Sequence, residues 1–212
     1  MDKEFICRDC GKSFTLAKEM SARYPNWTPK QCLDCRNGEH ATANTEEHLG
    51  RSEVLARYRE GPDTGVFTDG FCEPNPGIGG WGAVKVVEGE IVAERAGYEP
   101  ETTNNRMELE GLIEGYKMLG PDEELPVYTD SQLCVNTVTK WAKAWKRQGW
   151  TRGKKREPVM NLGLVQELYE LAQSRPKADL QWIKGHAGLR WNEYADALSR
   201  SKTPQAQEQQ SA

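Results

Sequence analysis

The stretch FTDGFCEPNPGIGGWG, residues 67–82, decides the fold. Its last six residues, GIGGWG, fit the pattern G-x-G-x-x-G that is typical of a dinucleotide-binding turn. That turn requires a helix that opens at the glycines, because the helix N-terminus binds the pyrophosphate. Residues 81–98 instead alternate β-branched and polar side chains around a turn at Glu88-Gly89, which predicts two further strands. The glycines therefore lead into a strand, and dinucleotide binding is disfavoured.

The sequence around this stretch predicts one α/β domain over residues 64–200. Short β-branched runs predict strands at 64–69, 81–88, 90–98, 125–130 and 178–185. Apolar residues with helical spacing predict helices at 103–119, from Ser131 onward, at 162–173 and at 192–200. Three hairpin-connected strands followed by strand–helix alternation predict a mixed five-stranded sheet with helices on both faces.

The composition of the 212-residue chain argues against a membrane or secreted protein. The chain begins with the charged segment MDKEFICRDC, and no apolar run approaches the roughly 18 residues of a membrane span. The formal net charge is −4, yet residues 140–156 carry eight Lys or Arg and no Asp or Glu. We expect a cytoplasmic monomer whose basic segment forms a local positive surface that the total charge conceals.

Four carboxylates occupy positions that suggest chemistry. Asp69 and Asp130 end two predicted strands, Glu108 lies one turn into a helix, and Asp196 lies in the last helix. Each alone is more often a turn former, a helix cap or a solvent-facing group. Four carboxylates at one end of a sheet would repel one another unless cations lay between them. Oxygen ligands favour two Mg²⁺ ions, or Mn²⁺, over zinc.

Five segments carry a resemblance to a known family. TDGFCEPNPGIGGWGAV, TNNRMELEG, YTDSQ, KGHAG and NEYADALS occur in this order over residues 64–200 and resemble type 1 ribonuclease H. The resemblance implies endonucleolytic cleavage of the RNA strand of RNA–DNA hybrids, leaving 3′-hydroxyl and 5′-phosphate ends. It implies that the metal-binding catalytic residues are Asp69, Glu108, Asp130 and Asp196, and that His186 assists proton movement and product release. The alternatives are another nuclease of this fold (a transposase, junction resolvase or 3′–5′ exonuclease) and a non-catalytic hybrid-binding module.

The same resemblance implies how the hybrid is bound. Cys72 and Asn75 match residues that face the 2′-hydroxyls of the RNA, the groups that distinguish RNA from DNA. Glu101 stands where relatives often have a basic residue, which predicts weaker phosphate binding there. The glycines of 77–82 are expected to let the backbone approach the nucleic acid closely. Residues 140–158 resemble a basic protrusion in which tryptophans form a small core and basic groups bind phosphates. The predicted substrate-binding residues are Cys72, Asn75, Thr103, Asn104, Asn105, Trp141, Lys143, Trp145, Lys146, Arg147 and Asn161, with Thr103 and Asn161 in a pocket for a DNA phosphate.

The cysteines near the N-terminus predict a second, smaller domain. The pairs Cys7-x-x-Cys10 and Cys32-x-x-Cys35 are separated by 21 residues, a spacing that favours a structural Cys₄ zinc ribbon over buried free thiols. Cys72 and Cys134 have no such partners. The predicted organisation is a zinc ribbon at 1–38, a linker with a short helix at 39–63, the ribonuclease H domain at 64–200 and a disordered tail at 201–212. The ribbon is expected to bind additional nucleic acid or a protein.

Overall fold

The computed structural model describes residues 4–7, 13–15 and 48–204, and the chain divides into two compact units, 1–48 and 49–212. In the smaller unit, β1 (Glu4–Ile6) pairs antiparallel with β2 (Ser13–Thr15). Of the predicted zinc ligands, Cys7 is described and buried. Cys10, Cys32 and Cys35 lie outside the described residues, as does most of the predicted tail.

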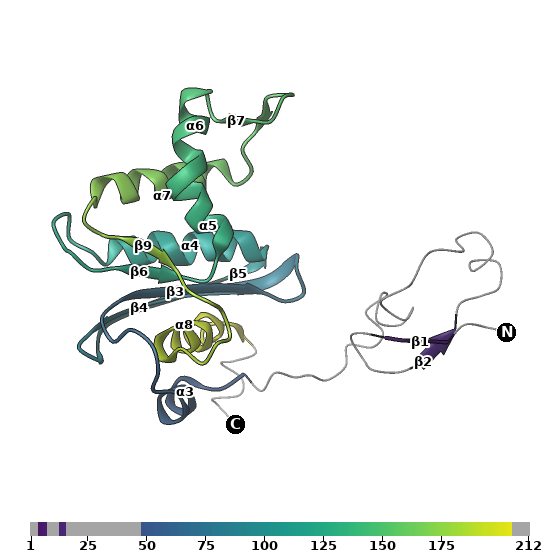
Figure 1. The fold of residues 1–212 in the computed structure, drawn as a ribbon, viewed down its shortest axis with the longest axis vertical. Helices are drawn as coiled ribbons and strands as arrows, with labels where there is room; N and C mark the ends of the chain where they lie inside the picture. Colours follow the sequence, from purple (N-terminus) through teal and green to yellow (C-terminus); the bar gives the residue numbers. More distant parts are fainter. Residues whose placement is uncertain (1–3, 8–12, 16–47, 205–212) are drawn as a thin grey trace. The chain divides into compact units, whose positions relative to one another are not determined.

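The larger unit is built on the mixed five-stranded sheet that the sequence predicts (Figure 1). Strands β3 (Gly65–Cys72), β4 (Gly77–Val87) and β5 (Glu90–Thr102) form an antiparallel meander. Strands β6 (Val127–Thr129) and β9 (Leu180–Trp182) add to it in parallel, giving the order β5-β4-β3-β6-β9. β3 is therefore the central strand, and it carries the first of the predicted carboxylates.

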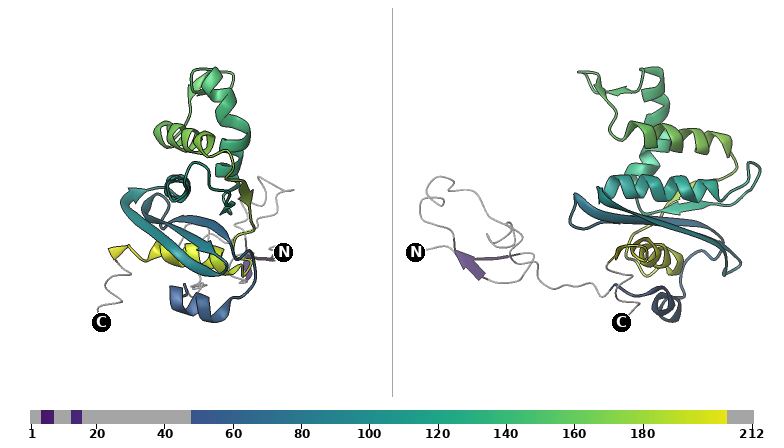
Figure 2. Two further views of the ribbon diagram at one scale, coloured as in Figure 1. Left: turned by 90° about the vertical axis from the view of Figure 1, so that its left-hand side faces the viewer. Right: turned by 180° about the vertical axis from the view of Figure 1, so that it is seen from behind.

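Helices cover both faces of this sheet, as Figures 1 and 2 show. α4 (Asn104–Lys117) lies on one face with α7 (Leu162–Ser174) packed behind it, and α8 (Arg190–Arg200) lies on the other. After β6 the chain continues through α5 (Gln132–Asn136), a π-helical turn η1 (Thr137–Trp141) and α6 (Ala142–Arg147). A short hairpin follows, made of β7 (Thr151–Arg152) and β8 (Glu157–Pro158). None of the described helices is long and apolar enough to cross a membrane.

Alternation along β3 divides the core into two layers. Val66 packs with Leu112 and other residues of the α4 side, whereas Phe67 packs with Trp191 and other residues of the α8 side. Successive strand residues point to opposite faces of a sheet, so both faces of this central strand can be buried. The two layers hold α4 and α8, which carry Glu108 and Asp196, on opposite sides of β3.

Two glycines of β4 allow the backbone of α8 to approach the sheet closely, whereas the sequence predicted an approach to nucleic acid. A Cβ at Gly82 would lie 2.6 Å from the backbone oxygen of Ala195 and 2.7 Å from the backbone nitrogen of Ser199. A Cβ at Gly80 would collide with the backbone oxygen of Ser199. These glycines therefore let the backbone of α8 contact the sheet, where the sequence had suggested a nucleic-acid strand.

The short helix expected between the two domains belongs to the larger unit. It is α3 (Arg51–Arg57), with Gly50 as its N-cap, whereas residues 39–47 of the predicted linker lie outside the described residues. Val54 of α3 is 2% exposed and packs against the α8 side of the core. The boundary between the compact units falls after residue 48, so residues 49–63 are structurally part of the larger unit.

Candidate active site

Strand register places Asp69 beside Asp130. β3 and β6 are parallel neighbours in which Thr68 pairs with Thr129, and each aspartate is the next residue along its chain. In this register, the residues that directly follow the paired strand residues lie side by side. The prediction that these two carboxylates lie at one end of the sheet is thus met by the observed register.

Glu108 joins them because α4 crosses very close to β3. A side chain at Gly70 would collide with the backbone nitrogen of Glu108, so only glycine permits this approach. One carboxylate oxygen from each of Asp69, Glu108 and Asp130 lies within 4.8 Å of the other two. Asp69 is oriented by the backbone N–H of Gly70, which donates to its Oδ1 at 2.7 Å.

Burial and mutual repulsion make this carboxylate group unusual. Asp69 is 7% exposed and Glu108 is 9% exposed. Burial, and then the charges of Glu108, Asp130 and Asp196, raise the pKa of Asp69 well above its usual value. Burial and the charge of Asp130 do the same to the pKa of Glu108, and burial raises the pKa of Asp130. The raised pKa values mean that burial and the neighbouring like charges disfavour the ionised forms of these acids.

The donor set of this group fits a divalent cation. Oε2 of Glu108 is buried and has no hydrogen-bond partner, which is costly for a carboxylate oxygen unless another group binds it. Carboxylate oxygens are the ligands that Mg²⁺ and Mn²⁺ prefer. The orphaned oxygen and the clustered acids together match a site for hard cations.

Asp196 lies outside the 4.8 Å group but near it, since its charge raises the pKa values of both Asp69 and Asp130. Its Oδ1 accepts a hydrogen bond from Nε of Arg200, one turn further along α8, at 3.2 Å. The Arg200 guanidinium also lies 4.3 Å from the centre of the Phe71 ring. The fourth predicted carboxylate is therefore held by an arginine that sequence reasoning did not select.

The turn between β9 and α8 carries His186, and residues on either side of His186, Gly185 in the turn and Asn192 in α8, lie against Asp130. A side chain at Gly185 would collide with the Asp130 carboxylate, and Nδ2 of Asn192 lies 3.5 Å from its Oδ2. His186 is exposed, and its charge lowers the pKa of Asp130, against the larger effect of burial. The sequence predicted His186 but did not select Asn192, although Asn192 is the first residue of the NEYADALS segment.

Four predicted substrate contacts surround the start of α4. Oδ1 of Asn75 accepts a hydrogen bond from the backbone N–H of Asn104 at 3.2 Å, which ties the turn after β3 to the helix. Thr103 is the N-cap residue of α4, yet its side chain makes no capping hydrogen bond. The thiol of Cys72 is half-buried, with the Pro74 carbonyl oxygen 3.2 Å away. The Thr103 hydroxyl is thus not engaged in capping the helix.

A small pocket of about 100 Å³ gathers other predicted contacts. Asn105, Trp141, Trp145 and Asn161 all line it, and the tryptophan rings lie 5.7 Å apart. Arg152, from β7, lines it as well. We call this the tryptophan–asparagine pocket. Arg152 was not selected from the sequence because the basic run gave no sign of which cation faces the tryptophans.

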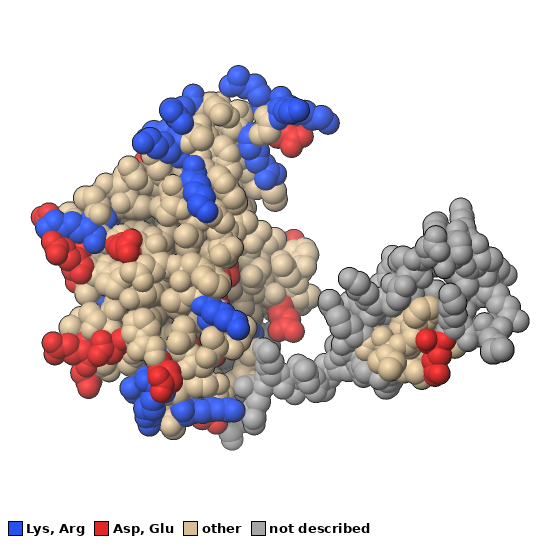
Figure 3. Space-filling model, viewed as in Figure 1, with Lys and Arg blue, Asp and Glu red and all other residues tan. Residues whose placement is uncertain are grey.

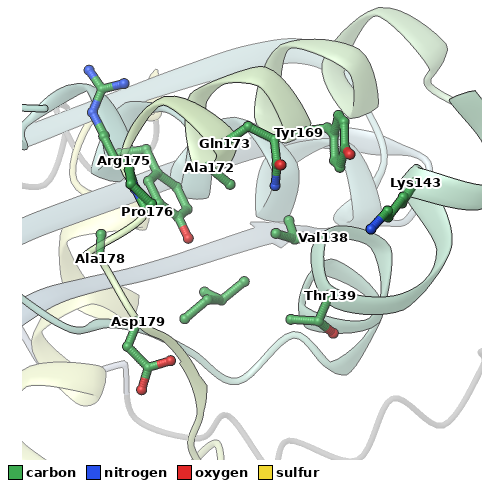
Figure 4. A pocket seen from close by; sticks show the side chains of 12 residues that line it. Val138, Thr139, Lys143, Tyr169, Ala172, Gln173, Arg175, Pro176, Ala178 and Asp179 are labelled. Atoms are coloured by element: carbon green, nitrogen blue, oxygen red, sulfur yellow. The ribbon is translucent and has the colours of Figure 1, made fainter.

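Lys143 and Lys146 of α6 are not among the residues that line this pocket, and the third basic residue of the helix, Arg147, is exposed. Lys143 lines a separate pocket of about 430 Å³ with Tyr169, Gln173 and Asp179, shown in Figure 4. Nζ of Lys146 lies 5.4 Å from the centre of the Tyr169 ring. Lys and Arg side chains nevertheless gather over α6 and the β7–β8 hairpin (Figure 3). The positive surface is present as predicted, but Arg152 is its cation in the tryptophan–asparagine pocket.

Comparison with known proteins bears on this architecture. A family model described as RNase H matches residues 62–203. A ribonuclease H of Erythrobacter litoralis (strain HTCC2594) is 48% identical over 134 residues, covering 63% of this chain and 91% of that protein. A ribonuclease H of Rhizobium etli is 48% identical over 135 residues, covering 64% of this chain and 87% of that protein.

Solved structures agree with the sequence relatives. The crystal structure of LC9-RNase H1, a type 1 RNase H with the type 2 active-site motif, is 29% identical, with a TM-score of 0.52 over 66% of this chain and 72% of that one. The N-terminal RNase H domain of a Mycobacterium tuberculosis protein, solved as a fusion with maltose-binding protein, is 28% identical, with a TM-score of 0.51 over 70% of this chain and 99% of that one.

The chain belongs to the RNase H family. Its activity is accordingly hydrolytic: it is an endoribonuclease that cuts the RNA strand of RNA–DNA hybrids.

Proposed function

We propose that the chain acts as a type 1 ribonuclease H that leaves 3′-hydroxyl and 5′-phosphate ends and uses divalent metal ions. The observation that carries the proposal is the group formed by Asp69, Glu108 and Asp130, each of which brings one carboxylate oxygen within 4.8 Å of the other two. A non-catalytic hybrid-binding module would have no need to gather these acids at the cost of their mutual repulsion.

Asp69, Glu108, Asp130 and Asp196 would hold two Mg²⁺ ions, with Mn²⁺ as a substitute. When bound, such ions supply an activated water and stabilise charge on the leaving oxygen. Asp69 would be one of these ligands, and the charges of all three other carboxylates raise its pKa. The Gly70 N–H occupies Oδ1 of Asp69 and so helps to fix the orientation of its carboxylate.

Neighbouring residues hold the other ligands and move protons. Asn192 restrains Asp130, and Arg200 restrains Asp196. His186 lies on an exposed turn beside Asp130, where an imidazole can transfer a proton near neutral pH and help the product leave. Asn192 and Arg200 would therefore orient the acids, and His186 would transfer a proton and help the product leave.

The hybrid is proposed to lie across the turn after β3, the start of α4 and the tryptophan–asparagine pocket. Cys72 and Asn75 would face the RNA 2′-hydroxyls. Thr103, whose hydroxyl makes no capping bond, would bind a DNA phosphate near Asn104. Asn105, Asn161 and Arg152 bring amide and guanidinium donors to the pocket beside the Trp141 and Trp145 rings, a combination suited to a phosphate and a stacked sugar or base. The carboxylate of exposed Glu101 would weaken phosphate binding nearby.

Cleavage of labelled duplexes tests this function. In Mg²⁺ the full chain should cut only the RNA strand of an RNA–DNA hybrid, at internal positions, and should leave duplex DNA and duplex RNA of the same sequence intact. The fragments should be extendable by a polymerase without phosphatase treatment, because they end in 3′-hydroxyls. Cutting of the DNA strand, or removal of nucleotides from one end only, would favour another nuclease of this fold.

We further propose that Cys7, Cys10, Cys32 and Cys35 bind one structural zinc ion in an auxiliary module that contacts extra nucleic acid or a protein. The paired C-x-x-C spacing supports this. Elemental analysis of the purified chain should find one zinc per chain, and Cys32→Ser should reduce that content without abolishing cleavage of short hybrids. A zinc content unaffected by Cys32→Ser would contradict the ligand set.

A further inference from the structure

Residues 49–61 precede the region that matches the family model, 62–203, yet they pack into the same compact unit. α3 lies beside α8, as the ribbon views show (Figures 1 and 2). Its buried Val54 belongs to a core cluster with Trp191 and Tyr194, both in the first half of α8. This N-terminal addition therefore supports the helix that carries Asn192 and Asp196.

The segment after α3 contacts the last residues of the turn that carries His186. The backbone N–H of Arg190 donates to the Glu60 carbonyl oxygen at 2.8 Å, and Glu60 and Leu189 form an isolated parallel β-bridge. The Tyr58 ring carbons lie 3.5 Å from the position that a Cβ on Gly188 would take. Residues 188–190 thus lie against residues 58–60, joined by the backbone hydrogen bond of Arg190 and with the Tyr58 ring beside Gly188.

The turn itself needs such support. His186 has φ of 49° and Gly188 has φ of 76°, so two residues of a short turn lie in the left-handed region. A non-glycine residue in that region persists only where the surrounding structure holds it. One end of the turn is fixed at Asp130 by Gly185, and the Gly188 N–H donates to Oε1 of Glu193 at 2.9 Å. The contacts from Tyr58 and Glu60 complete the support at the other end.

We propose that residues 49–61 are a positioning element of the active site, in which Tyr58 and Glu60 hold the His186 turn in the conformation needed for cleavage. Tyr58 is a positioning residue here and touches neither substrate nor metal. The inference rests on the role proposed above for His186.

A double-mutant cycle in the full chain separates positioning from general stabilisation. Tyr58→Ala should lower kcat about 3- to 10-fold while KM changes less than about twofold, because a small displacement of a catalytic group affects the reaction more than binding. In a His186→Ala background, the same substitution should change kcat less than about 1.5-fold, because residues that act through one another are not additive. Rates are measured where circular dichroism shows each variant to be folded.

Two control variants make the double-mutant cycle more specific. Tyr58→Phe keeps the ring and should behave as the wild type, and Tyr98→Ala removes the same side chain from an exposed site on β5 and should leave kcat unchanged. If Tyr58→Ala does not fold, Tyr58→Leu replaces it in the cycle. An unchanged kcat in the folded Tyr58 variant, or an equal loss in both backgrounds, overturns the inference. Failure of the wild-type chain to cut hybrids would instead refute the proposed function.

Discussion

Asp69→Asn should abolish cleavage while making the metal-free protein more stable at neutral pH. The amide cannot replace an ionised metal ligand, so we expect kcat to fall by about 10³-fold or more, the scale of losing a group that stabilises charge in the transition state. Cleavage of a labelled hybrid in Mg²⁺ by enzyme free of wild-type contamination measures this loss. A rate near that of the wild type would remove Asp69 from the reaction.

The stability gain follows from the direction of the pKa shifts. Burial and neighbouring carboxylates raise the folded-state pKa of Asp69, so its ionised form is disfavoured by folding. Its contribution is most favourable below the unfolded pKa, about 4, and is lost as pH rises through the raised folded value. Without metal, the wild-type melting temperature should therefore fall from pH 4 toward pH 8 more steeply than that of Asp69→Asn.

Glu110→Gln, which neutralises a half-buried acid of α4 that pairs with Arg106, is the matched control for the cleavage measurement.

Loss of the tryptophan–asparagine pocket should weaken hybrid binding without altering the reaction. Trp141→Ala combined with Arg152→Ala is expected to raise KM about tenfold or more, because a stacked aromatic ring and a phosphate contact each contribute measurably to affinity. kcat at saturating hybrid should change little, since neither side chain belongs to the carboxylate group. Titration of the hybrid at several salt concentrations separates the two contributions.

Salt dependence distinguishes Arg152 from the lysines that the sequence favoured. Arg152→Ala should flatten the slope of log Kd against log salt by about 0.7–0.9, as expected for one lost phosphate contact. Lys143→Ala should change the slope less, because Lys143 lines the other pocket, beside Tyr169 and Gln173. The reverse order would place the nucleic acid on the opposite face of α6.

Much of the site could be predicted because strand ends and motif order are encoded locally. Asp69 and Asp130 each follow a short apolar strand, and parallel pairing then brings them together. The approach of Glu108 depends on Gly70, a contact between residues 38 positions apart whose distance no local pattern specifies. The contacts of Arg200 with Asp196 and of Asn192 with Asp130 are seen only in the structure.

Other features escaped prediction because tertiary packing decides them. The glycines of β4 suggested a ligand, yet Gly80 and Gly82 are required by the backbone of α8. The basic run predicted a positive surface correctly, but composition could not show that Arg152 of β7 is the cation beside the tryptophans. A short helix within 39–63 was expected, whereas its bounds and its packing through Val54 were not, because a single apolar residue carries no periodic signal.

The most direct test of the central claim, that the buried carboxylates form a divalent-metal site, is the melting temperature as a function of Mg²⁺ concentration in the absence of substrate. Ions that bind the folded protein alone stabilise it in proportion to the logarithm of their concentration above the dissociation constant. For the wild type at pH 8 the melting temperature should rise steadily with Mg²⁺. For Asp69→Asn it should start higher and rise much less. Equal Mg²⁺ dependence in the two proteins would show that the ions bind elsewhere and would contradict the account.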